Sequence, residues 1–170
     1  MALSCKVGTF TGQNDTNNQA VTGVGFQPKA VIIWHDNSTA VGSAINAQLG
    51  IGLAVSSTQR ASCWSIYADA QGTADNIRRA ENAKCINVTS AGVGTVLGAA
   101  DFVSMDSDGF TIDWTSANAT IFNYMALGGA DLTNAAVLEL LTPAITGSVG
   151  YTGVGCKPDC VIAISSFVAT

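Results

Sequence analysis

The sequence predicts an all-β protein: an antiparallel β-sandwich of jelly-roll-like type, with little helix. Eight or more short segments of apolar or alternating residues recur along the 170-residue chain, and turn signals separate them about every ten to fifteen residues. Helical periodicity is almost absent. Short strands at this spacing are typical of two antiparallel sheets packed face to face.

The first strands are predicted over residues 6–11 and 21–34, on either side of a polar loop at residues 12–19. The second of them contains a Gly-x-Gly turn and Pro28, followed by a run of apolar residues at 30–34. Proline at the start of a strand loses no ladder hydrogen bond. Because consecutive positions of the run are apolar, we expect this strand to be covered on both faces.

Residues 45–56 and 61–68 are predicted as the next two strands. In the first of these, one face carries an apolar row, which consists of Ala47, Leu49, Ile51, Leu53 and Val55. The other face carries Gly50 and Gly52. Glycine leaves room for a near neighbour, so another part of the chain is expected to pack closely against these two residues.

One short helical segment is predicted. Asp75 can cap one or two turns over residues 75–82, with Arg78 and Arg79 behind it. The dipeptide Asp108–Gly109, between apolar alternations, is typical of a hairpin turn. The remaining strands are predicted at residues 85–88, 94–105, 110–114 and 121–127.

Residues 152–164 repeat residues 22–34, shifted by 130 positions without a gap, and seven of the thirteen pairs are identical. A match of this density indicates an internal duplication. We therefore divide the chain into a complete sandwich unit over residues 1–131 and the start of a second copy over residues 136–170, with a strand expected at 136–141. Unfinished strands expose sheet edges, so the second segment is expected to complete the first unit or to pair with a neighbouring subunit.

Composition narrows the possible functions. Charged residues make up 11% of the chain and apolar residues 48%, so the surface is nearly uncharged and poorly protected against self-association. The net charge of −5 and only seven Lys and Arg argue against a nucleic-acid partner. No apolar segment has the length of a membrane helix and the N-terminus has no apolar signal core, so we expect folding in a cytoplasm and no membrane partner.

No metal or cofactor is predicted. The five cysteines contain no C-x-x-C pair and the chain has one histidine, whereas a zinc site needs about four clustered ligands. Cys156 and Cys160 stand where the first copy has Phe26 and Ala30. Since they replace core-type residues, we favour buried thiols over a disulfide.

The acidic residues could in principle bind calcium or cleave glycosides. Asp106, Asp108 and Asp113 resemble part of a calcium loop, but a third ligand before the glycine and a distal glutamate are missing, so we favour a hairpin turn. A carboxylate pair for glycoside hydrolysis could be drawn from these residues and Asp101. Glutamate occurs only twice, which makes that pair a weak candidate.

The histidine and the aromatic residues are the other candidates. His35 and Asp36 could serve acid-base chemistry, although we favour a solvated loop histidine, because the second copy has two serines there. A sugar-stacking platform could be built from four aromatic residues if they were exposed, but their strand positions favour the core: Trp34, Trp64, Trp114 and Tyr67. We assign no catalytic residue and do not expect an enzyme.

Four motifs carry a resemblance to a known family; they are Gly8-Thr9-Phe10-Thr11-Gly12, the stretch from Val21 to Ile32, the stretch from Asp106 to Ile112, and the stretch from Tyr124 to Gly129. Together they resemble a repeated β-domain of structural proteins of tailed bacteriophages and prophages, in which a VGFQPD strand and a DGFT hairpin recur. Lys29 stands where that family often has Asp, and the second copy keeps Asp159. The resemblance covers roughly residues 6–130 and implies the fold more strongly than the function.

We therefore expect a structural protein of a virus particle, a decoration protein on the capsid exterior or a tail component. It would be made in the host cytoplasm, reside in the virion, and assemble with copies of itself and other virion proteins. The alternative is a receptor- or glycan-binding module of a tail fibre that uses the loops at residues 12–19 and 35–43 to bind a host surface glycan. Exposed aromatics at one end of the sandwich would favour the alternative, and apolar contact between identical subunits would favour the structural role.

Overall fold

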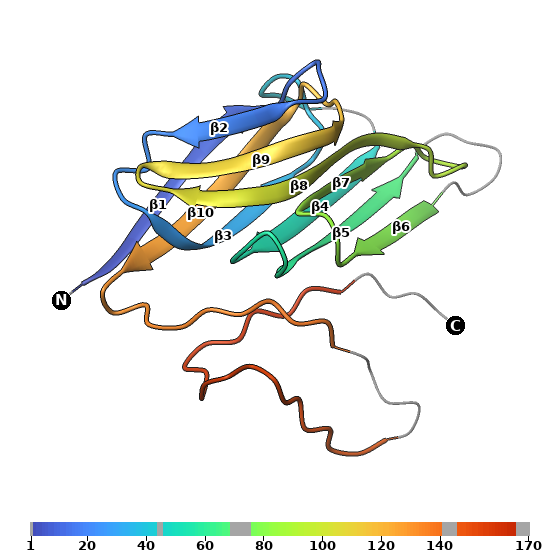
Figure 1. Ribbon diagram of the computed structural model, residues 1–170. Helices are drawn as coiled ribbons and strands as arrows, with labels where there is room; N and C mark the ends of the chain where they lie inside the picture. Colours follow the sequence, from blue (N-terminus) through green and yellow to red (C-terminus); the bar gives the residue numbers. More distant parts are fainter. Residues whose placement is uncertain (1, 44–45, 69–75, 141–145, 166–170) are drawn as a thin grey trace.

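The computed structural model describes residues 2–43, 46–68, 76–140 and 146–165. Ten strands lie between Leu3 and Gly129 (Figure 1). They are β1 (Leu3–Thr11), β2 (Asn18–Thr22), β3 (Pro28–His35), β4 (Ala47–Ala54), β5 (Arg60–Tyr67), β6 (Asn76–Glu81), β7 (Ile86–Thr89), β8 (Val96–Asp106), β9 (Gly109–Ser116) and β10 (Ile121–Gly129).

The strands form two packed antiparallel sheets, which confirms the predicted β-sandwich. The larger sheet has the order β1-β10-β3-β4-β5-β6, and the smaller has the order β2-β9-β8-β7. In Figure 1 the smaller sheet covers one face of the larger sheet. The first three strands pair with the last two, since β1 and β3 flank β10 and β2 pairs with β9.

Aromatic side chains fill the space between the sheets. The largest fully buried side chains include Trp64, Trp114, Phe102, Phe110 and Phe122. Trp114 and Phe122 lie with ring centroids 5.4 Å apart, and Phe110 meets Tyr124 edge to face at 5.4 Å. Such pairs add to the hydrophobic gain from burying the rings.

The repeated stretch crosses from one sheet to the other. Its first residues belong to β2 and its last to β3, so the single strand predicted over residues 21–34 is two strands joined by the Gly-x-Gly turn. Gly23 and Gly25 have φ angles of 83° and 86°, which a glycine adopts without strain. The side-chain carboxylate of Asp108 accepts hydrogen bonds from the backbone amides of both glycines. The backbone carbonyl of Asp108 accepts one from the Val24 amide. The predicted hairpin turn between β8 and β9 is confirmed, and it holds this crossing in place.

Replacing Asp108 with alanine is expected to lower the free energy of unfolding by about 1–2 kcal/mol, because two backbone amides lose a charged acceptor near the surface. Urea denaturation of the wild type and D108A measures the change. Asp15 lies in an exposed loop and bonds only to neighbouring polar side chains, so D15A is the matched control. Equal midpoints for D108A and D15A would contradict the role of this turn.

The glycine face of β4 points into the sandwich, and the predicted close packing against Gly50 and Gly52 is confirmed. A Cβ added to Gly52 would lie 1.7 Å from the Cys85 carbonyl oxygen, and one added to Gly50 would lie 2.1 Å from Nε2 of His35. The apolar row of β4 therefore points to the outside of the sandwich, where Leu49 is exposed and Ile51 and Leu53 are half-buried.

The predicted helix over residues 75–82 is wrong in its described part. Residues 76–81 form β6, which pairs with β5 from Asn76 to Glu81. Ile77 packs against the core, while Arg78 on the opposite side is exposed. Pairing and burial of alternate residues outweigh a weak helical signal, and charged side chains are common on an edge strand.

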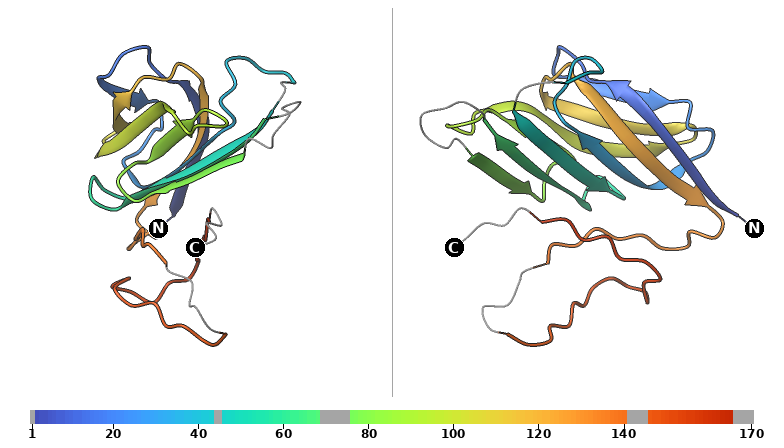
Figure 2. Two further views of the ribbon diagram at one scale, coloured as in Figure 1. Left: turned by 90° about the vertical axis from the view of Figure 1, so that its right-hand side faces the viewer. Right: turned by 180° about the vertical axis from the view of Figure 1, so that it is seen from behind.

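The chain beyond Gly129 contributes no strand to either sheet in its described part. The strand predicted at residues 136–141 is absent over 136–140, and residue 141 lies outside the described residues. We call residues 132–140 and 146–165 the arm; it runs below the larger sheet in both views (Figures 1 and 2). Its glycines at 153 and 155 have φ angles of 90° and 76°, so the turn of the first copy is repeated locally.

Candidate functional site: the outer face of the larger sheet

Over five of its six strands, the side of the larger sheet that faces away from the core is largely apolar; on β6 the charged Arg78 lies opposite Ser65 on this side. Paired residues of neighbouring strands lie on the same face, and one row across five strands is Val7, Met125, Ile32, Leu53 and Ala61. We define the outer face as the residues of this row and the two rows beside it: Cys5, Leu127, Ala30, Thr9, Asn123, Trp34, Ile51 and Cys63, together with Leu49, Ser65 and Tyr67 on β4 and β5.

The outer face carries no charged side chain over these residues of β1, β10, β3, β4 and β5. Val7 is 59% exposed and Leu49 is 53% exposed, while Ile32 and Trp34 are half-buried. The expectation that residues 30–34 are covered on both faces is therefore wrong within a single chain: Val31 and Ile33 lie in the core, and their neighbours face outward. Apolar patches of this kind are typical of surfaces that contact another protein, a membrane or a ligand.

A groove of about 360 Å³ separates part of the outer face from the arm. Its walls are Leu53, Ala61 and Cys63 on the sheet, and residues 136–140 and 162–165 of the arm. Two hydrogen bonds cross from the sandwich to the arm: Asn82 Nδ2 donates to Glu139 Oε2 at 3.1 Å, and the Val137 amide donates to Gln59 Oε1 at 3.3 Å. The groove is thus lined mainly by apolar side chains, together with the polar residues Ser62, Asn82 and Ser165 and the carboxylates of Glu81 and Glu139.

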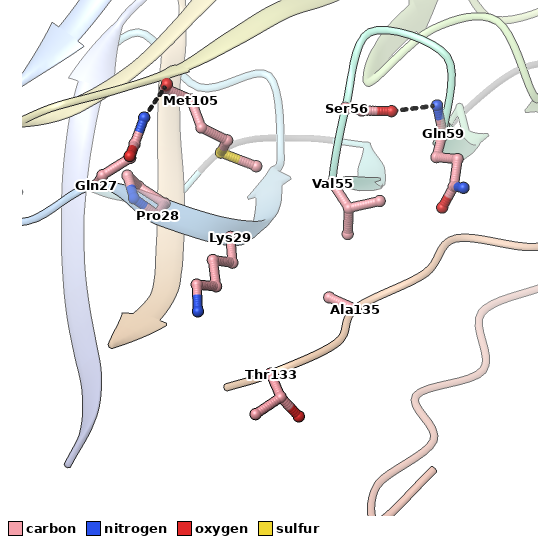
Figure 3. Close-up of a pocket in the computed structure, with 9 residues that line it drawn as sticks. All are labelled: Gln27, Pro28, Lys29, Val55, Ser56, Gln59, Met105, Thr133 and Ala135. Atoms are coloured by element: carbon pink, nitrogen blue, oxygen red, sulfur yellow. Dashed lines mark hydrogen bonds between the residues drawn. The ribbon is translucent and has the colours of Figure 1, made fainter. Parts of the chain in front are cut away.

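A second pocket, of about 410 Å³, opens where β3 begins (Figure 3). Lys29 reaches into it, and Gln27 on its wall donates to the Met105 carbonyl at 2.9 Å. The Lys29 ammonium donates to the carbonyls of Gly129 at 3.0 Å and Leu132 at 2.7 Å, so its charge fixes the start of the arm. The lining residues include amide, hydroxyl and apolar groups but neither a carboxylate nor an imidazole.

His35 is buried and not solvated, which corrects the sequence-based expectation. It is the last residue of β3, is 3% exposed, and stacks on Trp64 with ring centroids 5.1 Å apart. Desolvation lowers its pKa from 6.5 to about 4, although the nearby Asp36 charge opposes this shift. Asp36 itself accepts a hydrogen bond from the Ser38 amide. Comparing His35 with the serine at its position in the second copy could not reveal this burial, because the ring that stacks on His35, Trp64, comes from a different strand.

Three of the four candidate carboxylates, Asp101, Asp106 and Asp108, are held by separate local contacts. Asp101 forms ion pairs with Arg60 at 3.2 Å and Lys84 at 2.9 Å. Asp106 accepts hydrogen bonds from the hydroxyls of Ser104 and Thr111, and Asp108 holds the Gly-x-Gly turn. Asp113 lies opposite Asp101 in the register of β8 and β9. Within the described residues no group of three or more His, Cys, Asp or Glu could hold a metal ion.

The aromatic candidates divide between the core and the outer face. Trp64 and Trp114 are buried, as predicted, whereas Tyr67 is half exposed and Trp34 is half-buried on the outer face. Trp34 is level with Cys63 across β4, so Tyr67 lies two rows further along β5. The two exposed rings therefore do not form one stacking platform.

No cysteine of the described chain is in a disulfide, in agreement with the prediction of thiols, but the predicted burial of the arm cysteines is wrong. Cys160 is exposed and Cys156 is half-buried, because the arm does not enter the core. Cys85 is the buried thiol: desolvation raises its pKa from 9 to about 12. Its Sγ lies 3.4 Å from the Ala100 carbonyl oxygen, to which it donates.

Comparison of the chain with protein-family models, with curated proteins and with solved structures found no match. Over the described residues no helix is long and apolar enough to cross a membrane. The outer face is therefore the feature of the structure from which a function can be argued.

Proposed function

We propose that this protein is a structural subunit of a virus particle, on the capsid exterior or in the tail, and that it assembles with copies of itself through the outer face. The observation that carries the proposal is the charge-free apolar surface over five strands of the larger sheet. Burying apolar surface is the main favourable contribution to protein association. An apolar patch this extended is uncommon on a protein that works as a monomer.

The composition and the motifs support the virion assignment. The low charged content leaves few groups that would oppose contact between identical surfaces. The motifs that resemble phage repeat domains are the same residues that position this face, since Asp108 holds the turn leading into β3. Mass spectrometry of purified particles from a producing culture tests the location, and absence of the chain from them would contradict it.

A glycan-binding module remains the second candidate because Tyr67 is half exposed on the outer face. Sugar recognition by stacking needs an aromatic ring open to a ligand. Trp34 is too far along the sheet to share one platform with it. Monomeric protein that binds an array of host surface glycans would favour this candidate over the structural role.

Light scattering of the purified chain tests self-assembly. We expect an oligomer for the wild type and a mass near that of one chain for the double variant V7D/L49D, since two charges would be buried in the interface. Both residues are exposed in the single chain, so the fold should remain stable. Val41, 103% exposed in a loop away from the outer face, provides the control variant V41D. A monomeric wild type at high concentration, or an unchanged oligomer for V7D/L49D, would contradict the proposal.

A further inference from the structure

The arm lies beside the outer face of its own sandwich without being packed tightly against it. Leu138, Leu140 and Ile162 remain between 37% and 52% exposed. The two side-chain hydrogen bonds, from Asn82 to Glu139 and from Val137 to Gln59, connect its first part to the turns beside β5. Within one chain, the contact between the arm and the outer face is therefore made by polar groups, and the apolar side chains of the arm beside it remain partly exposed.

The arm has the sequence of paired strands but no strand partner. Residues 152–164 repeat residues 22–34, which contain the Gly-x-Gly turn and most of β3, and β3 lies in the larger sheet. No described residue of the arm belongs to a strand in the single chain. Extended segments with unpaired backbone groups are suited to contact with another chain.

The arm does not fit the position of β3 in the sandwich. Ala163 corresponds to Ile33, a fully buried core residue, and would leave a cavity there. Exchange of the arm for β3 of another copy is thus disfavoured, which favours the outer face as the surface it contacts.

We infer that the arm is an exchange arm: in the assembled protein, residues 136–140 and 162–165 lie in the groove over β4, β5 and β6 of a second copy of the chain. This inference rests on the proposed self-assembly and names the contact that would produce it. The same residues can meet between chains as within one chain, which is why exchange of an identical segment is an easy route to an oligomer. The apolar residues of the arm match those of the outer face in character. The two carboxylates that line the groove have partners of their own, since Glu81 pairs with Arg79 and Glu139 accepts from Asn82.

Lys29 fixes the point where the arm leaves the sandwich, so the rest of the arm can move to a second copy without a change at that point. Its ammonium holds the carbonyls of Gly129 and Leu132, so the exit of the arm from β10 is fixed at the edge of the pocket in Figure 3. The described residues after Leu132 are largely exposed and belong to neither sheet (Figure 2). The arm can therefore leave its own outer face without breaking a strand pair.

A cross-linking experiment tests the inference. Asn82 and Glu139 are exposed and meet at the ends of their side chains, so the shorter thiols of N82C/E139C are joined by a bismaleimide with a short spacer instead of a direct disulfide. The variant is made in a full chain that keeps buried Cys85 and has serine at the other cysteines, which are Cys5, Cys63, Cys156 and Cys160. After treatment with the bismaleimide, denaturing electrophoresis separates links between chains from links within one chain, and peptide mass spectrometry verifies the 82–139 link. N82C alone and E139C alone are the matched controls.

We expect covalent dimers or longer covalent chains linked through 82 and 139, at a level several-fold above either control. A link confined to single chains, or no link at all, would overturn the exchange arm. The wild-type mass from light scattering separates this failure from failure of the proposed function: an oligomer with only intrachain links leaves self-assembly intact, whereas a monomer removes both.

Discussion

Gly52→Ala is expected to lower the free energy of unfolding by about 3 kcal/mol or more, at the upper end of the cost of overpacking a core. The new Cβ would lie 1.7 Å from the Cys85 carbonyl oxygen and 2.9 Å from its carbonyl carbon. Backbone cannot rotate away as a long side chain can. Cys85 is also held to β8, because its amide donates to the Ala100 carbonyl at 2.9 Å. The sheets would have to separate at the point where β4 meets the start of β7.

Denaturant unfolding of G52A and wild type measures this loss. Gly150 lies in the arm with nothing within 4 Å of an added Cβ, so G150A is the matched glycine-to-alanine control and should be near neutral. A G52A protein as stable as G150A would show that the two sheets are not in contact at Gly52.

Acidification from pH 7.5 to pH 5 is expected to cost the wild type about 2 kcal/mol of unfolding free energy through His35 alone. The pKa of His35 is about 4 in the fold and near 6.5 when unfolded. Between these values the unfolded chain binds the proton and the folded chain does not, so stability falls as the pH falls. The contribution is fully present above pH 6.5 and is lost as the pH approaches 4.

His35→Phe removes the titrating group while keeping a flat ring against Trp64. Urea midpoints of wild type and H35F, measured at pH 7.5 and pH 5, give the difference in pH dependence. The comparison stops at pH 5 because the carboxylates of a protein in general titrate at lower pH. The same slope in both proteins would mean that His35 is solvated in the fold.

In the proposed assembly, the outer face and the arm supply the contacts between subunits that carry few charges. The outer face offers apolar surface without charge, and the arm offers apolar side chains that its own sandwich leaves exposed. The mass and cross-linking experiments address these two features separately. Neither feature needs a cofactor or a catalytic group.

Much of the secondary structure follows from local sequence. The strands predicted at residues 61–68 and 121–127 correspond to β5 and β10, and Asp-Gly predicted the turn between β8 and β9. The duplicated Gly-x-Gly turn has the same left-handed φ angles in both copies, although only the first copy is held by Asp108. Such features are local, because they depend on the conformational freedom of a few consecutive residues.

The sequence by itself determined an all-β sandwich, a close approach at Gly50 and Gly52, and a surface with little charge. Tertiary structure alone decided which side of β4 faces the core, since the ring of His35 and the backbone of Cys85 take the space beside the glycines. It also turned residues 76–81 into an edge strand through pairing with β5. Burial of His35 and exposure of the apolar row of β4 depend on partners far apart in the chain, and a single sequence read locally does not specify which partners meet.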